Sequence, residues 1–286
     1  MYLDIKKVNH FHDVEYNNFN QPVLVSGGCK DMMAVKTWDI DRLRDIIKDN
    51  LIQVEVYHDQ KSMGDTDCQY KLIRFDDFLE HSINDKMPYY YFAEYSIDKF
   101  KKQKAYDMIK NDIKFSFDQM RECDNELLYM GLNTLSGCHL HVEDDFVLNQ
   151  IIEKKTVFLF NYYDNPQLKM RSFMSSNNNF LKMNFNDIDH NKVKLYKVIL
   201  NPGDSLIIPP WWFHAVKGHQ YSCSITKIYK RTDLEYYYKY KYLGFLHIIQ
   251  VIKNCGKTLC KSNYYKTVLY TMLIILIVEI HKEIMK

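Results

Sequence analysis

The chain has 286 residues, enough for one domain with additions at its ends, and a formal net charge of +2 at pH 7. No long basic block or acidic tail is present, so the sequence has no charged tail for binding nucleic acid. A basic groove formed by the folded chain is still compatible with this composition. The seven cysteines form no Cys-x-x-Cys pair and the first residues are polar, which predicts an intracellular protein of the cytoplasm or nucleus with reduced thiols. The wealth of Tyr, Lys, Ile and Asn indicates an AT-rich source genome.

The first 120 residues are predicted to form an N-terminal α/β part that packs on the rest of the domain. Alternating or apolar runs predict strands, and apolar residues at helical spacing predict helices. The predicted strands are Asn20–Gly27, Ile52–Tyr57 and Tyr89–Glu94, and the predicted helices are Trp38–Asp49 and Arg74–His81. The Lys-rich segment Asp98–Phe117 is predicted to be helix plus loop.

Residues 121–231 have a different pattern, with short β-like runs separated by turns from Leu127 to Tyr229. Such runs predict a sandwich or barrel. The Asn-rich stretch Ser175–Asn191 interrupts them and is predicted to be an exposed insertion. The predicted fold class is therefore mainly β with flanking helices.

Residues 232–286 are predicted to form a C-terminal helical tail. Helical spacing returns in Thr232–Lys253, and Thr267–Val278 is apolar on every face over twelve residues. A membrane span needs about 20 such residues, so a buried or dimer-interface helix is the favoured interpretation. A short tail anchor, with membrane contact through residues 267–278, is the alternative.

Three side chains could together hold one metal ion. His141 and Glu143 are two residues apart in a β-like run, so they share one face of a strand. His214 follows the turn Asn201–Asp204 and the apolar run Ser205–Ile208, which a barrel can place beside the first run. Two histidines and one carboxylate form the facial triad of non-heme iron(II) oxygenases.

The residues around these three resemble the Jumonji-C (JmjC) family, especially its small cupin-like hydroxylases, which act on protein side chains or on a modified tRNA base. The most specific match is Leu200–Val216, LNPGDSLIIPPWWFHAV, and Gln150–Phe160 matches a second block. The resemblance covers roughly residues 18–231. It implies a double-stranded β-helix (cupin or jelly-roll) core that uses Fe(2+) and 2-oxoglutarate.

The resemblance also implies roles for single residues. His141, Glu143 and His214 would be the iron ligands, and Lys155 would bind the distal carboxylate of 2-oxoglutarate, with Lys154 as the alternative. Tyr91 matches a family tyrosine that bonds the same carboxylate. Thr134 lies near the position of a family threonine and completes the predicted co-substrate contacts.

Some residues depart from the family pattern, and they keep two alternatives open. The acid is Glu143 and not Asp, and Glu153 replaces a family glycine. The chain could therefore be an inactive cupin-like binding protein without a metal. It could also be a cupin that uses His139, His141 and His214 without 2-oxoglutarate, although we favour His139 as a polar cavity residue or substrate contact.

The sequence thus predicts an iron(II)- and 2-oxoglutarate-dependent dioxygenase. It would hydroxylate a macromolecular substrate, either a protein side chain or a tRNA base. A homodimer through the C-terminal helices is a further expectation.

Overall fold

The computed structural model describes residues 2–14, 20–48, 50–59, 63, 68–84, 87–101, 104–141, 144–162, 164–165, 167–171 and 179–230. Residues 1–231 form one compact unit and residues 232–286 a second. The predicted C-terminal helices, including residues 267–278, lie outside the described residues. Among the helices that are described, none combines the length and the apolar character that crossing a bilayer requires.

Two β-sheets form the body of the compact unit. The large sheet has nine strands in the order β1-β2-β10-β7-β12-β6-β5-β3-β4, and its neighbours are antiparallel except β1 and β2. Its strands are β1 (Lys6–Val8), β2 (Val23–Val25), β3 (Leu51–Tyr57), β4 (Gln69–Arg74), β5 (Tyr89–Ser96), β6 (Cys123–Leu132), β7 (Asp144–Ile152), β10 (Ser205–Ile208) and β12 (Tyr221–Lys230).

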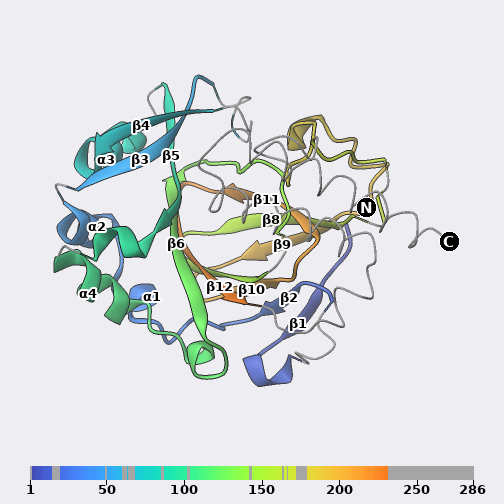
Figure 1. The fold of residues 1–286 in the computed structure, drawn as a ribbon, viewed down its shortest axis with the longest axis horizontal. Helices are drawn as coiled ribbons and strands as arrows, with labels where there is room; N and C mark the ends of the chain where they lie inside the picture. Colours follow the sequence, from blue (N-terminus) through green and yellow to red (C-terminus); the bar gives the residue numbers. More distant parts are fainter. Residues whose placement is uncertain are drawn as a thin grey trace, which may run out of the picture. The chain divides into compact units, whose positions relative to one another are not determined.

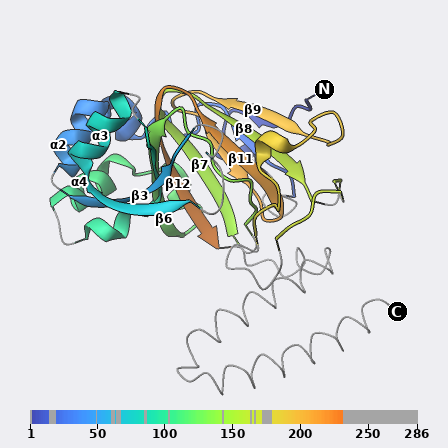
Figure 2. The ribbon, with the colours of Figure 1, turned by 90° about the horizontal axis from the view of Figure 1, so that it is seen from above.

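The small sheet is antiparallel, in the order β11-β8-β9. Its strands are β8 (Lys155–Asn161), β9 (Tyr196–Leu200) and β11 (Trp212–Gly218). The two views in Figures 1 and 2 place this sheet on one side of the large sheet and the helices on the other. The predicted mainly β, cupin-type fold is confirmed.

The α-helices of the described residues come from the N-terminal part, whose strands β3 to β5 continue the large sheet. The helix α2 begins after Asp39, whose side chain accepts a hydrogen bond of 2.7 Å from the Arg42 amide, a regular N-cap. Its buried face carries Leu43, Ile46 and Ile47. The helices are α1 (Met33–Thr37), α2 (Ile40–Ile47), α3 (Phe75–Ile83) and α4 (Lys104–Asp112), with short 3-10 turns at Phe11–Asp13, Ile97–Phe100, Ser116–Gln119 and Phe185–Asp187.

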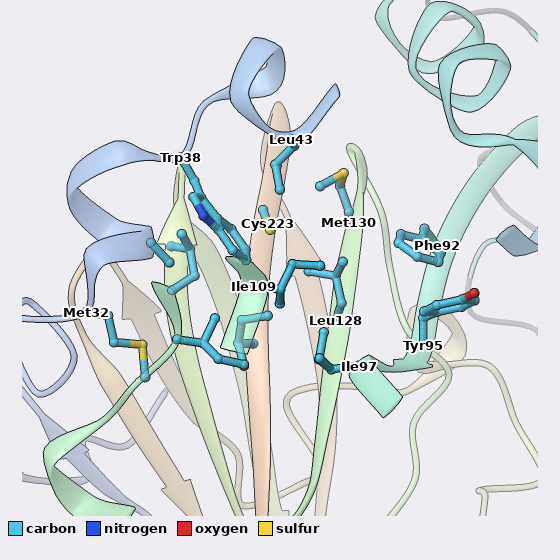
Figure 3. Packing of buried hydrophobic residues seen from close by; sticks show 14 of the residues in the cluster. Met32, Trp38, Leu43, Phe92, Tyr95, Ile97, Ile109, Leu128, Met130 and Cys223 are labelled. Carbon is cyan, nitrogen blue, oxygen red and sulfur yellow. The ribbon is translucent and has the colours of Figure 1, made fainter. Parts of the chain in front are cut away.

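Strand alternation divides the interior into two cores. Side chains on the outer face of the large sheet, such as Leu128 and Cys223, pack with Trp38, Leu43 and Ile109 of the helical layer (Figure 3). Alternate residues on the inner face pack between the sheets with the small sheet. This second cluster comprises Leu148, Val157, Leu159, Val198, Leu200, Leu206, Ile208, Trp212 and Val216. The space between the two sheets is therefore separate from the helical core.

Two local predictions were wrong. The run that contains His141 is not a regular strand in its described part, because His139 forms only isolated bridges and β7 begins at Asp144. The stretch 175–191 is not simply exposed, since Leu181, Phe185 and Ile188 are buried within its described part. Apolar residues spaced among the asparagines produce that second difference.

Candidate metal and co-substrate site

A cavity lies between the two sheets. Apolar side chains form much of its wall, and a few polar groups converge in it, as is usual for small-molecule sites. The polar lining comes from the large sheet, the small sheet and the segment before β7, and comprises Tyr91, Tyr129, Ser136, His139, His141, Lys155, His214, Ser224 and Thr226.

A cluster of histidines occupies one part of this cavity. The ligand atoms of His139, His141 and His214 all lie within 4.8 Å of one another. A metal with bonds of about 2.1 Å holds its ligand atoms roughly 3 to 4 Å apart, so small side-chain rotations suffice to bind one ion. The structure thus brings His141 and His214 together, with His139 beside them, and their role as metal ligands stays a prediction.

Backbone carbonyls orient two of the rings. The Nδ1 of His139 lies 2.8 Å from the Gly137 carbonyl, and the Nδ1 of His214 lies 3.1 Å from the Trp212 carbonyl. A carbonyl oxygen can only accept a hydrogen bond, so each Nδ1 carries the proton and each Nε2 keeps its lone pair. Metal-binding histidines are commonly oriented in this way.

All three histidines are held in the neutral form that binds metals. Burial lowers the pKa of His139, and it lowers the pKa of His141 and of His214 well below the ordinary value. Mutual repulsion adds to the effect, because His214 and His139 both disfavour a charge on His141. Neutral imidazole is a suitable ligand for iron, zinc, copper and nickel, so this donor set fits a divalent transition metal.

Lys155 projects into the same cavity from the first residue of β8. Its side chain is 1 % exposed, and its Nζ donates a hydrogen bond of 2.6 Å to the Ser224 hydroxyl on β12. Within the described part of the chain, no carboxylate forms an ion pair with it. Burial lowers the pKa of Lys155 to about 8. An anion that entered the cavity would supply the missing counter-charge.

Two tyrosines stand near this ammonium. Tyr91 and Tyr129 both line the cavity with ring centroids 6.5 Å apart, and the Lys155 Nζ lies 5.9 Å from the Tyr129 ring centroid. Burial raises the pKa of each phenol above its ordinary value, so both remain hydroxyl donors near neutral pH. Tyr91 was singled out in the sequence, whereas Tyr129 was not.

Of the other two predicted residues, one is not described and one lies outside this group. Glu143 lies outside the described residues, so its part in metal binding stays a prediction. Thr134 is buried against Gly131 and Gly218 and is not among the residues that line the cavity. The cavity residue nearest to it in sequence is Ser136, whose hydroxyl accepts a hydrogen bond from the Val216 amide.

Comparison with known proteins agrees with this fold. A family model described as a cupin-like domain matches residues 9–240, which is most of the chain. The chain therefore belongs to the cupin-like, JmjC-type family, which confirms the resemblance carried by Leu200–Val216. One curated relative is the tRNA wybutosine-synthesizing protein 5 of Danio rerio, with 23% identity over 261 residues, covering 84% of this chain and 77% of the relative.

Proposed function

We propose that this chain is a hydroxylase that depends on iron(II) and 2-oxoglutarate. The observation that carries the proposal is the meeting, in one cavity, of a histidine cluster and a buried lysine that has no carboxylate partner among the described residues. Family membership supports an enzyme of the oxygenase class. In the predicted set, His141, Glu143 and His214 bind the iron and Lys155 binds the distal carboxylate.

The strand register supports a co-substrate with an acidic group at each end. His214 on β11 pairs with Leu159 on β8, and Lys155 pairs with Gly218 at the end of the same ladder. Lys155 and Leu159 are four residues apart, so their side chains share one face and are separated by about 13 Å along the strand. A short dicarboxylate can bridge a bound metal and the lysine across that interval.

Each protein group then has a task in the reaction. Bound iron would supply the activation of dioxygen, so that the co-substrate becomes succinate and carbon dioxide while one oxygen atom enters a substrate C–H bond. Lys155 and Tyr91 hold the distal carboxylate and thereby orient the keto acid. The apolar wall, including Phe146, Leu148 and Ile208, excludes water from the reacting groups.

The direct test measures succinate from the full chain with iron(II), ascorbate, 2-oxoglutarate and candidate substrates. We expect substrate-stimulated succinate from the natural protein and none from His214→Ala. A protein that binds metal but releases no succinate above that control, with both tRNA and peptide substrates, would be a binding protein and not a hydroxylase.

Among substrates, we favour tRNA over a protein side chain. The named relative belongs to tRNA wybutosine synthesis. In addition, residues 168–171 and 179–182 form a paired segment that carries exposed Lys169 and Lys182. This segment touches the site, because the Phe180 ring stacks on His139 at 4.9 Å. Cationic side chains at a cavity edge are suited to phosphate contacts.

Salt-dependent binding separates the two substrate classes. We expect Lys169→Ala and Lys182→Ala each to weaken tRNA binding and to lower the slope of log affinity against log salt by about 1. The matched control replaces the exposed Lys7 and Lys36, which lie on other elements, and it should change neither quantity. Unchanged binding in the first pair of variants would favour a protein substrate.

A further inference from the structure

We propose that His139 is itself a metal ligand, so that the centre of this chain is built on the imidazoles of His139, His141 and His214. This inference deepens the proposed function, because it concerns the same centre, but it is a statement about metal binding alone. It replaces the interpretation of His139 as a polar contact for the substrate, and it gives His139 the ligand position that the predicted set assigns to Glu143.

Backbone pairing places His139 directly beside His214. The His139 amide donates to the His214 carbonyl at 3.1 Å, and the His214 amide donates to the His139 carbonyl at 2.8 Å. Two residues that exchange both hydrogen bonds form a close antiparallel pair whose side chains lie on the same face. Their ring centroids are accordingly 4.3 Å apart. A polar substrate contact would not require this direct pairing with a ligand.

The two rings are also oriented by the same device. In each case the proton on Nδ1 is directed to the carbonyl of the residue two positions earlier, Gly137 for His139 and Trp212 for His214. Each Nε2 therefore keeps its lone pair as the free donor. Phe180 stacks on the His139 ring with planes 25° apart, which limits rotation of that ring.

His141 closes the triangle from the same segment. Its ring centroid lies 4.9 Å from that of His139 and 4.9 Å from that of His214. Phe146 stacks on His141, so an aromatic ring supports this imidazole as Phe180 supports His139. The three rings are thus mutual neighbours, with every pair of centroids within 4.9 Å.

The composition of this centre has a chemical consequence. Three neutral imidazoles leave the whole charge of a divalent ion uncompensated, whereas a carboxylate ligand would neutralise part of it. A more positive metal attracts anionic ligands more strongly, and imidazole suits several transition metals. We therefore expect the metal-loaded site to accept small anions readily.

Metal binding by the full-length chain tests the inference without any turnover. Equilibrium dialysis with Co²⁺ at pH 7.5, followed by metal analysis, should give one ion per chain for the natural protein. His139→Ala should lower the Co²⁺ affinity roughly 100-fold, as much as His214→Ala, because each removes one ligand. His219→Ala is the matched control, since this half-buried histidine bonds Thr156 outside the cluster and should leave the affinity unchanged.

A second measurement guards against variants that only misfold. In His139→Gly, free imidazole added at millimolar concentration should restore Co²⁺ binding, and Cu²⁺-loaded protein should lose one coordinated imidazole in pulsed electron paramagnetic resonance. The inference is overturned if the natural protein binds no Co²⁺, or if His139→Ala keeps its affinity within threefold.

These outcomes are distinguishable from failure of the proposed function, because the assay contains neither 2-oxoglutarate nor oxygen. If metal binding depends on His139 but no succinate forms, the proposed hydroxylase function is contradicted and the three-imidazole centre is supported. If succinate forms but Co²⁺ affinity does not depend on His139, the hydroxylase function is supported and the three-imidazole centre is contradicted.

Discussion

Lys155 and Lys227 are both 1 % exposed, but their surroundings differ completely. The Nζ of Lys227 lies 2.6 Å from an oxygen of Asp118 and 2.9 Å from an oxygen of Glu126. The Nζ of Lys155 donates to a serine hydroxyl, and no carboxylate of the described residues forms an ion pair with it. Both ammonium groups are removed from water, but only that of Lys227 has a counter-charge among the described residues.

The difference separates structure from binding. A buried charge with its partners in place holds elements together, here β12 with β6 and the turn Ser116–Gln119. A buried charge without such a partner costs free energy that only a ligand can recover. Burial lowers the pKa of Lys155 to about 8, because the charged ammonium is less stable in the cavity than in water.

The largest effect is expected at the structural lysine. Lys227→Met leaves Glu126 and Asp118 without their shared cation, and breaking a buried pair in this way should cost about 3 kcal/mol in the free energy of unfolding. Urea denaturation of the natural and variant proteins measures this loss.

Lys230→Met provides the matched control on the same strand. Its Nζ pairs with Asp124 at 2.8 Å, but the lysine side chain is 70 % exposed, so we expect no measurable change in the free energy of unfolding. Equal losses from the two variants would mean that burial does not distinguish these lysines.

The binding lysine should show the opposite pattern. Lys155→Met removes an unpaired buried charge, so stability should stay unchanged or rise. The same variant should bind 2-oxoglutarate roughly 100-fold more weakly, because a charged hydrogen bond contributes about 2 to 3 kcal/mol. Calorimetry of the metal-loaded protein measures the affinity, and undiminished binding would remove Lys155 from the co-substrate site.

Part of the site could be predicted from the sequence, but the partners of the two buried lysines could not. The proximity of His141 and His214 could be predicted from the motif around His214 and from the turn and apolar run before it. The partners of Lys227 could not, because Asp118 and Glu126 lie about a hundred positions earlier and only the sheet register brings them close.

The inner face of the large sheet was hard to identify for a different reason. Both faces of β12 are covered, one by helices and one by the small sheet, so residues Tyr221–Tyr229 are all buried. A strand buried on both sides loses the polar and apolar alternation that reveals its inward residues. Ser224 could therefore not be assigned to the cavity, although it lines it.

The pH dependence of binding sharpens the comparison further. The Lys155 ammonium is the form that binds an anion, and its pKa is lowered to about 8. Affinity for 2-oxoglutarate should therefore be constant well below pH 8 and fall about tenfold per pH unit well above it. Calorimetry between pH 6.5 and about 9.5 should show this bend in the natural protein, and Lys155→Met should lack it.

The smallest effect is expected at Tyr91, which tests whether the lysine acts alone. Tyr91 is 3 % exposed and lines the cavity, and its raised pKa keeps the phenol protonated as a donor. Tyr91→Phe removes one hydrogen bond worth about 1 kcal/mol, so 2-oxoglutarate should bind roughly fivefold more weakly. Tyr90→Phe is the control, because this neighbour stacks on His81 and accepts from Lys71 on an exposed surface. If both variants bind 2-oxoglutarate with the same affinity, Lys155 holds the distal carboxylate without a hydrogen bond from Tyr91. The Tyr91 ring then contributes only to the packing of the cavity wall.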